Sequence, residues 1–347
     1  MIENQDTDAI RLVVRAIVPL DVPLLVDSAA FNATCPISLS RGPGRLLLPA
    51  CPDGIMEPFK APDGFHVTER FWGQGTKSSN EGGQGLVEAV GIELVPTHAS
   101  LGFPTEELSK AYARGLEDVE TEMVDWVRRF QGWGEVLARQ SLSPLEPLPT
   151  LVSLPSDGVI TWVIADERMS WPYSSQRTIK ITLAGPLGPL SERVADTSTL
   201  SRMAALADDP EAVAPAAVVL IASARRAAQR GQWRLALMEL GTALEALLTA
   251  QLTLAPGSYM TLGPLTKAAL KAGVALPQDV LARFVKPRNA AVHDGLIPSA
   301  AVVVDGLAML DRLCDVAHPT YRCDPNLHVA HRPHRHDLTI MKPPNSA

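Results

Sequence analysis

The chain has 347 residues, a formal net charge of −7 and a hydrophobic fraction of 46%. Its length is typical of two domains, and its acidic balance excludes a polycation that coats nucleic acid over its whole surface. Any contact with nucleic acid would therefore need a local basic patch.

The sequence lacks the signals of secretion and of membrane insertion. The first residues, MIENQDTDAI, have neither the basic nor the apolar region of a signal peptide, and the apolar run APAAVVLIASA is too short to span a bilayer. Four cysteines without a C-x-x-C pair favour reduced thiols, namely Cys35, Cys51, Cys314 and Cys323. We therefore expect a cytoplasmic protein that does not enter a membrane.

The first 200 residues predict a β-rich domain. Residues 10–18, IRLVVRAIV, alternate apolar and polar side chains with the period of a half-buried strand. Residues 85–95 and 158–167 read in the same way, and residues 177–185, RTIKITLAG, are a fourth candidate strand. The glycine-rich residues 73–85 predict an exposed, flexible loop, and their GQGTK lacks the spacing of a phosphate-binding loop.

One helix is predicted inside this β-rich region, over residues 105–130. Glu106 and Glu107 occupy its first turn, where the helix dipole favours acidic side chains. Apolar residues recur at steps of three and four and form one stripe, at Leu108, Tyr112, Leu116, Val119, Met123, Trp126, Val127 and Phe130. The stripe predicts packing against the sheet, with a ligand groove as the alternative.

From about residue 205 the pattern becomes helical. A hairpin of two helices, over residues 211–230 and 232–252, is broken at Gly231. A shorter helical pair within residues 262–285 and a last helix within 298–318 complete a predicted bundle of four or five helices over 205–318. Residues 319–347 lose this periodicity and predict an extended or disordered tail that adds little stability. The expected fold class is α+β.

The segment KPRNAAVHDG, residues 286–295, places three polar side chains in an otherwise apolar helical region. Pro287 predicts the start of a helical turn or a kink in a longer helix, and Gly295 predicts a helix C-cap. Arg288 and His293 then lie on one short helix, about 140° apart around its axis. They are positioned to flank a cleft or to meet the same residues of a second subunit.

These residue types suit cleavage of a phosphodiester without a metal. Histidine titrates near neutrality and can act as a general acid or base, so His293 could move a proton to or from a ribose oxygen. Arg288 could neutralise the charge that grows on phosphorus, and Asn289 could bind a phosphate oxygen or orient the imidazole. The structural alternative is that Arg288 pairs with Glu245 or Asp294 and that His293 caps a helix.

The hairpin ARRAAQRGQWRLALMELGTALEALL followed by RNAAVHDG resembles the HEPN superfamily over residues 205–318. The family signature is an Arg, a polar residue and a His (R-x4-6-H), matched by Arg288, Asn289 and His293. The resemblance implies a dimeric bundle that acts as a metal-independent endoribonuclease without a cofactor, often in toxin or anti-phage defence. It also implies a supporting carboxylate on the second helix, matched by Glu245, while Lys286 and Asp294 flank the motif. Some members are inactive and only dimerise or bind nucleotides.

The helical region is the part of the chain expected to meet RNA. Residues 211–317 carry two more basic than acidic residues, whereas the whole chain is acidic. Four arginines cluster at the hairpin turn and either track an RNA backbone or form a solvated helix end: Arg225, Arg226, Arg230 and Arg234.

The histidine-rich tail with Cys323 has no spacing of a closed zinc site, so we expect no metal.

Two functions follow from these features. In the first, the chain is a dimeric ribonuclease whose residues 1–200 sense a trigger or select the substrate. In the second, the helical region only dimerises, and residues 1–200 bind a protein partner or a ligand. Cleavage of RNA in the presence of EDTA distinguishes the two.

Overall fold

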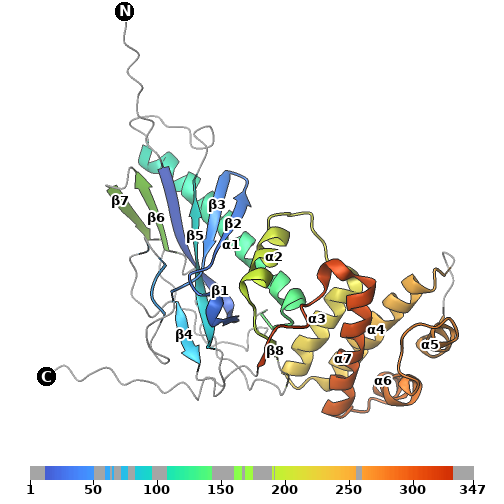
Figure 1. Cartoon of the computed structure of the whole chain (residues 1–347). Helices are drawn as coiled ribbons and strands as arrows, with labels where there is room; N and C mark the ends of the chain where they lie inside the picture. The colour runs from blue at the N-terminus through green and yellow to red at the C-terminus, as the bar shows by residue number, and fades with distance from the viewer. Residues whose placement is uncertain are drawn as a thin grey trace, which may run out of the picture. The chain divides into compact units, whose positions relative to one another are not determined.

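The computed structural model describes residues 12–50, 59–62, 65, 72–76, 83–95, 108–142, 160–165, 169–174, 190, 192–254 and 260–330. It contains an antiparallel sheet and a set of helices, so the protein is α+β (Figure 1). The chain divides into two compact units. Unit 1 comprises Met1–Gly134, Glu146–Thr182 and Ala195–Ala212, and unit 2 comprises Glu135–Leu145, Leu183–Val194 and Val213–Ala347.

Unit 1 is built on a sheet in the order β2-β3-β5-β1-β6-β7, with β4 also paired to β5. Its strands are β1 (Leu12–Asp27), β2 (Thr34–Leu39), β3 (Gly42–Leu47), β4 (Gly73–Thr76), β5 (Gln84–Leu94), β6 (Ile160–Ala165) and β7 (Met169–Ser174). Strands β1, β5 and β6 confirm the three predictions made from alternation. The fourth predicted strand, residues 177–185, lies outside the described residues.

Strand β4 corrects the prediction of a loop over residues 73–85. Strand β3 pairs only with the last four residues of β5, which leaves the first part of that long strand with an open edge. Gly73–Thr76 occupy this edge by pairing with Val87 to Gln84. The backbone groups of β5 thereby find partners along the strand, which outweighs the weak strand preference of glycine.

Helices α1 (Leu108–Leu137) and α2 (Thr197–Ala207) complete the described core of unit 1. The apolar stripe of α1 is buried from Val119 onwards, and Trp126 stacks on Phe130 with ring centroids 5.4 Å apart. This confirms core packing for that part of the stripe, whereas the side chains of Leu108, Tyr112 and Leu116 lie outside the described residues. Helix α2 was not predicted; Asp196 caps it by accepting a hydrogen bond from the Thr199 backbone at 2.7 Å.

Polar contacts fix α1 on the sheet. The amide of Gln131, which is buried, donates to the backbone carbonyl of Val22 at 3.1 Å. Val22 lies where the pairing of β1 with β5 shifts register between Pro19 and Leu24. A bulge leaves backbone groups without ladder partners, and Gln131 satisfies one of them.

A buried carboxylate joins three neighbouring strands of the sheet. Glu93 on β5 accepts hydrogen bonds from Arg15 on β1 at 2.9 Å and from Arg45 on β3 at 3.1 Å. Burial alone would raise the pKa of Glu93, but the hydrogen bonds and charges of Arg45 and Arg15 outweigh it and the pKa is lowered. The carboxylate therefore stays ionised, and breaking the pairs would leave a buried charge.

Unit 2 contains the predicted helices. They are α3 (Ala216–Gln229), α4 (Trp233–Gln251), α5 (Leu262–Lys271), α6 (Lys286–His293) and α7 (Ala300–Ala317), with a π-helical turn at Leu281–Val285. Gly231 breaks the hairpin as predicted, with a φ of 71°. Helices α3, α4 and α7 pack side by side (Figure 1), and the leucines of α4 at 237, 240, 244 and 247 form the centre of their core.

The described part of the predicted extended or disordered tail, residues 319–330, contains short elements and buried side chains. Pro319–Tyr321 form a short 3₁₀ turn, and β9 (Val329–Ala330) pairs with β8 (Glu192–Arg193). Cys323 and Leu327 are buried, and the Arg193 guanidinium donates to the Leu327 carbonyl at 2.7 Å. Residues 319–330 lack the apolar periodicity of a helix or strand, and two buried side chains and a few backbone hydrogen bonds hold them in place. Residues 331–347 lie outside the described residues.

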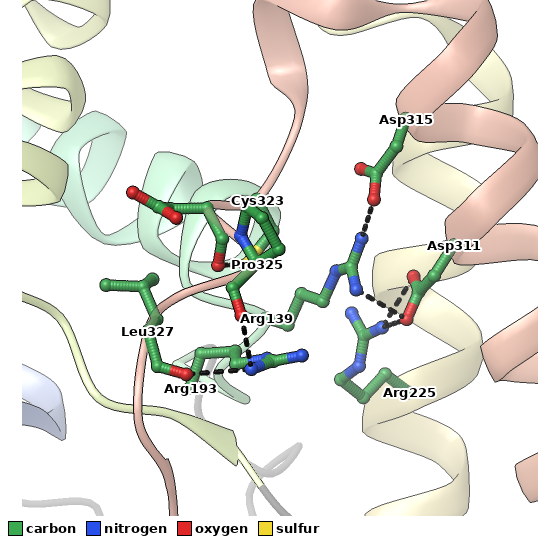
Figure 2. A network of polar contacts seen from close by, with 9 residues as sticks. Arg139, Arg193, Arg225, Asp311, Asp315, Cys323, Pro325 and Leu327 are labelled. Carbon is green, nitrogen blue, oxygen red and sulfur yellow. Dashed lines mark hydrogen bonds and ion pairs between the residues drawn. The ribbon is translucent and has the colours of Figure 1, made fainter.

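An ion-pair network in unit 2 joins the end of α1 to α3 and α7 (Figure 2). Arg139 contacts Asp315 at 2.7 Å and Asp311 at 3.3 Å, and Arg225 meets both carboxylate oxygens of Asp311 at 2.9 and 2.8 Å. Burial alone would lower the pKa of Arg139, but the carboxylates, Asp311 foremost, raise it above its ordinary value. Arg139 holds this position with a φ of 52°, in the left-handed region.

Shortening the chain tests the packing of residues 319–330. A chain that ends at His318 should unfold more easily than one that ends at Ala330, by about 2–4 kcal/mol, because it loses the buried side chains of Cys323 and Leu327 and the pairing of β9 with β8. Both chains lack residues 331–347, so the difference in urea unfolding midpoint reports on 319–330 alone. Equal midpoints would contradict the packing described here.

The thiol of Cys314 provides a test that depends on pH. Burial, followed by the charges of Asp315 and Asp311, raises its pKa to about 11. Only about one thiol in a thousand is then ionised at pH 8, so alkylation by iodoacetamide should be far slower than in the urea-unfolded chain. The raised pKa also means that this thiol's contribution to stability is complete below about pH 9 and is lost as the pH rises towards 11.

Asp315→Asn removes one nearby negative charge, so it should lower the pKa of Cys314 and speed its alkylation. Mass spectrometry of the Cys314 peptide measures the rate. Modification of the folded wild-type chain at pH 8 as fast as that of the unfolded chain would contradict the environment described for this thiol.

Candidate functional site

Helix α6 follows the π-helical turn Leu281–Val285 without a break. The Lys286 backbone N–H bonds to the Leu281 carbonyl, five residues back, as a π turn requires. Pro287 has no N–H, and in a regular α-helix its ring would clash with the carbonyl four residues earlier. The wider π turn accommodates the ring, so Pro287 lies at the start of α6 inside a longer helical segment, as predicted.

The end of α6 is fixed by two different devices. Gly295 has a φ of 69°, which lets the Leu296 backbone turn back to the Ala290 carbonyl at 3.3 Å and confirms the predicted C-cap. From α4, the Nε of Arg234 donates to the Ala291 carbonyl at 2.8 Å. A cation at the C-terminus of a helix is favoured by the helix dipole, so Arg234 stabilises the end that carries His293.

Arg288 turns towards α4. Its Nη1 donates to the Asn289 side-chain oxygen at 3.2 Å, and its Nη2 lies 3.5 Å from Oε1 of Glu245. The Nε is buried without a hydrogen-bond partner, although 17% of the side chain is exposed. The guanidinium is thus oriented by a neighbour on its own helix and by a carboxylate on α4.

The structure brings together only part of the predicted site. Arg288, Asn289 and Glu245 meet at the α4–α6 contact, and Arg234 reaches the backbone of α6. Lys286, His293 and Asp294 are exposed on or beside α6. His293 is therefore open to solvent at one end of the helix, while Arg288 is anchored one and a half turns before it.

The predicted RNA contacts of Arg225 and Arg226 need correction. The Arg225 side chain is only 7% exposed and pairs with Asp311, and Arg226 pairs with Glu135 at the end of α1. Both charges are paired inside unit 2, and because Arg225 is buried, neither predicted alternative, RNA contact or a solvated helix end, describes it. Of the other two arginines, Arg230 is half-buried at the end of α3 and Arg234 is exposed.

The sequence interpretation missed the contact between Arg234 and Ala291. Nothing in the sequence pattern could reveal it, because residues 57 positions apart are joined through a backbone carbonyl. The charge of Arg234 near Arg225 and Arg226 in the sequence predicts an RNA contact or a solvated helix end, whereas in the structure its side chain donates to the backbone of α6.

No metal or membrane feature accompanies this site in the part of the chain that the structure describes. No group of three or more His, Cys, Asp or Glu side chains there is arranged to hold a metal ion. His328 is exposed beside β9, and His331, His334 and His336 lie outside the described residues. No described helix combines the length and the apolar character that crossing a membrane requires.

Comparison of the chain with protein-family models, with curated proteins and with solved structures found no match. The function of the site must therefore be inferred from its own residues and their geometry.

Proposed function

We propose that residues 205–318 form a HEPN-like domain and that the protein is a metal-independent endoribonuclease. The observation that carries this proposal is the arrangement on α6. One arginine is oriented by Asn289 and Glu245, and a histidine is exposed at the end of the same eight-residue helix. An oriented cation and an accessible acid–base group are the two parts that RNA cleavage without a metal needs.

His293 acts as the base in this reaction. It takes the proton from the ribose 2′-OH, and the 2′-oxygen attacks phosphorus to form a cyclic phosphate. The bond to the 5′-oxygen breaks, and that oxygen receives a proton from water. Arg288 stabilises the negative charge that develops on the phosphate oxygens.

The proposed active unit is a homodimer formed through the helical region, acting in the cytoplasm. Large apolar side chains directly after the motif support a protein contact there: Ile297 is 78% exposed, and Leu296 is also exposed. Lys286 and Arg234 are exposed basic residues near α6 that would bind the RNA backbone, and Asp294 flanks His293. Residues 1–200 would sense a trigger, as in toxin or anti-phage defence systems.

A His293→Ala chain tests the chemistry. Purified wild-type protein should cleave RNA in the presence of EDTA, and the variant should lose about 100-fold or more of this activity. Because His293 is exposed, the free energy of unfolding should change by less than about 0.5 kcal/mol. His328→Ala, an exposed histidine in a different place, is the matched control and should keep full activity.

Full activity of His293→Ala would remove His293 from the mechanism. A wild-type chain that dimerises but does not cleave RNA would instead favour the second function, a non-catalytic dimerisation module attached to a partner-binding or ligand-binding unit 1.

A mixing experiment tests the dimer. Arg288→Ala and His293→Ala chains are each expected to be inactive. If each site combines Arg288 of one subunit with His293 of the other, random mixing restores about a quarter of the sites, because half of the dimers are mixed and one of their two sites is intact. Light scattering confirms the oligomeric state. A monomer at micromolar concentration, or mixed dimers without activity, would contradict the composite site.

A further inference from the structure

Gly241 on α4 lies directly under the side chain of Arg288. A Cβ atom placed on Gly241 would lie 2.6 Å from Nε, 2.9 Å from Cγ and 3.2 Å from Cδ of Arg288. The first two distances are shorter than carbon contacts in proteins allow. All three of these nearest atoms belong to Arg288, so any side chain at position 241 has to displace that arginine.

The glycine is not explained by its helix. Gly241 is buried in the middle of α4, where glycine is less favourable than alanine and no positive φ requires it. Other glycines of unit 2 differ: a Cβ on Gly263 in α5 would meet nothing within 4 Å, and one on Gly306 in α7 would meet the ring of Phe284. The missing side chain at 241 serves Arg288 in particular.

The close approach of Gly241 and Arg288 also determines the direction in which the guanidinium group points. Nε faces α4 and is buried without a partner, whereas Nη1 and Nη2 are held by Asn289 and Glu245. A side chain that stands away from α4 would instead present Nε and be free to rotate. The close approach at Gly241 thus selects one orientation of Arg288 among its many rotamers.

We propose that Gly241 is a positioning residue for Arg288: it provides the gap on α4 that holds the arginine in the orientation that stabilises the negative charge developing on the phosphate during RNA cleavage. The phosphate role rests on the proposed function, whereas the positioning itself rests on the contact. Displacing a group by about 1 Å from its working geometry can lower a rate about 100-fold. A methyl group at position 241 is therefore enough to impair the site.

The test is a double-mutant cycle in the full chain with Gly241→Ala and Arg288→Ala. In the wild-type background, Gly241→Ala should lower the melting temperature or leave it unchanged, because the helix gain is offset by the clash. In the Arg288→Ala background, the same change should raise it by about 2–4 °C, because the clash is gone and alanine favours the helix. Gly263→Ala is the control and should have the same effect in both backgrounds.

Activity provides the second measurement. Gly241→Ala should lower kcat about 100-fold with little change in KM, as expected for lost transition-state stabilisation. In the Arg288→Lys background it should cause little further loss, since the oriented guanidinium is already absent. A purely structural defect would lower activity by the same factor in both backgrounds. Gly263→Ala should keep full activity.

The outcomes separate the two proposals. Equal shifts in melting temperature in both backgrounds, or full activity of Gly241→Ala, would overturn the positioning role. If Gly241→Ala does not fold, the double variant should fold, and failure of both would also overturn it. If wild-type protein does not cleave RNA while the melting temperatures stay coupled, the proposed function fails and the positioning of Arg288 by Gly241 stands.

Discussion

The arrangement of unit 2 around its candidate site depends on the missing N–H of Pro287. Because this residue cannot join a regular helical ladder, the segment before it takes a π turn and the segment after it is α6. One side chain on either side of the proline then reaches a glycine of another helix: Phe284 covers Gly306 on α7, and Arg288 covers Gly241 on α4. An apolar anchor and a polar anchor thus hold the same short segment.

Several charged side chains of unit 2 form ion pairs inside the unit instead of facing solvent. The count of basic residues suggested a cationic surface at the hairpin turn, but Arg225 and Arg226 form ion pairs within the unit. Such pairs are costly to break, because removing one partner leaves the other charge poorly solvated. Two of the four clustered arginines are therefore used within unit 2, and a third, Arg234, contacts the backbone of α6.

Features that repeat along the chain could be predicted from sequence. Alternation revealed β1, β5 and β6, and steps of three and four revealed α1 and the hairpin of α3 and α4. Strands β2 and β3 were not predicted because prolines and glycines interrupt their alternation. In β3, glycine is required at position 44, since a Cβ there would lie 2.7 Å from the Glu93 carbonyl oxygen. Strand β4 and residues 319–330 escaped because distant residues determine their structure.

In the candidate site, too, features set by neighbouring residues could be predicted and those set by distant residues could not. Pro287 and Gly295 act on their own neighbours, so the bounds of α6 could be predicted from local rules. The partner of Arg288 could be suggested, since Glu245 lies on a predicted helix, but the direction of the guanidinium could not. That direction depends on how closely two helices approach, and no single-sequence pattern records a distance between helices.

The left-handed backbone of Arg139 has a consequence for the tolerance of this position to substitution. Glycine would adopt a φ of 52° without strain but would lose the contacts with Asp311 and Asp315. Lysine would keep the charge but could not reach both carboxylates with a planar fork, and a β-branched residue would suit neither demand. Backbone and side chain thus ask for different amino acids at one position. Few amino acids meet both the backbone and the side-chain requirement, so position 139 should tolerate few substitutions.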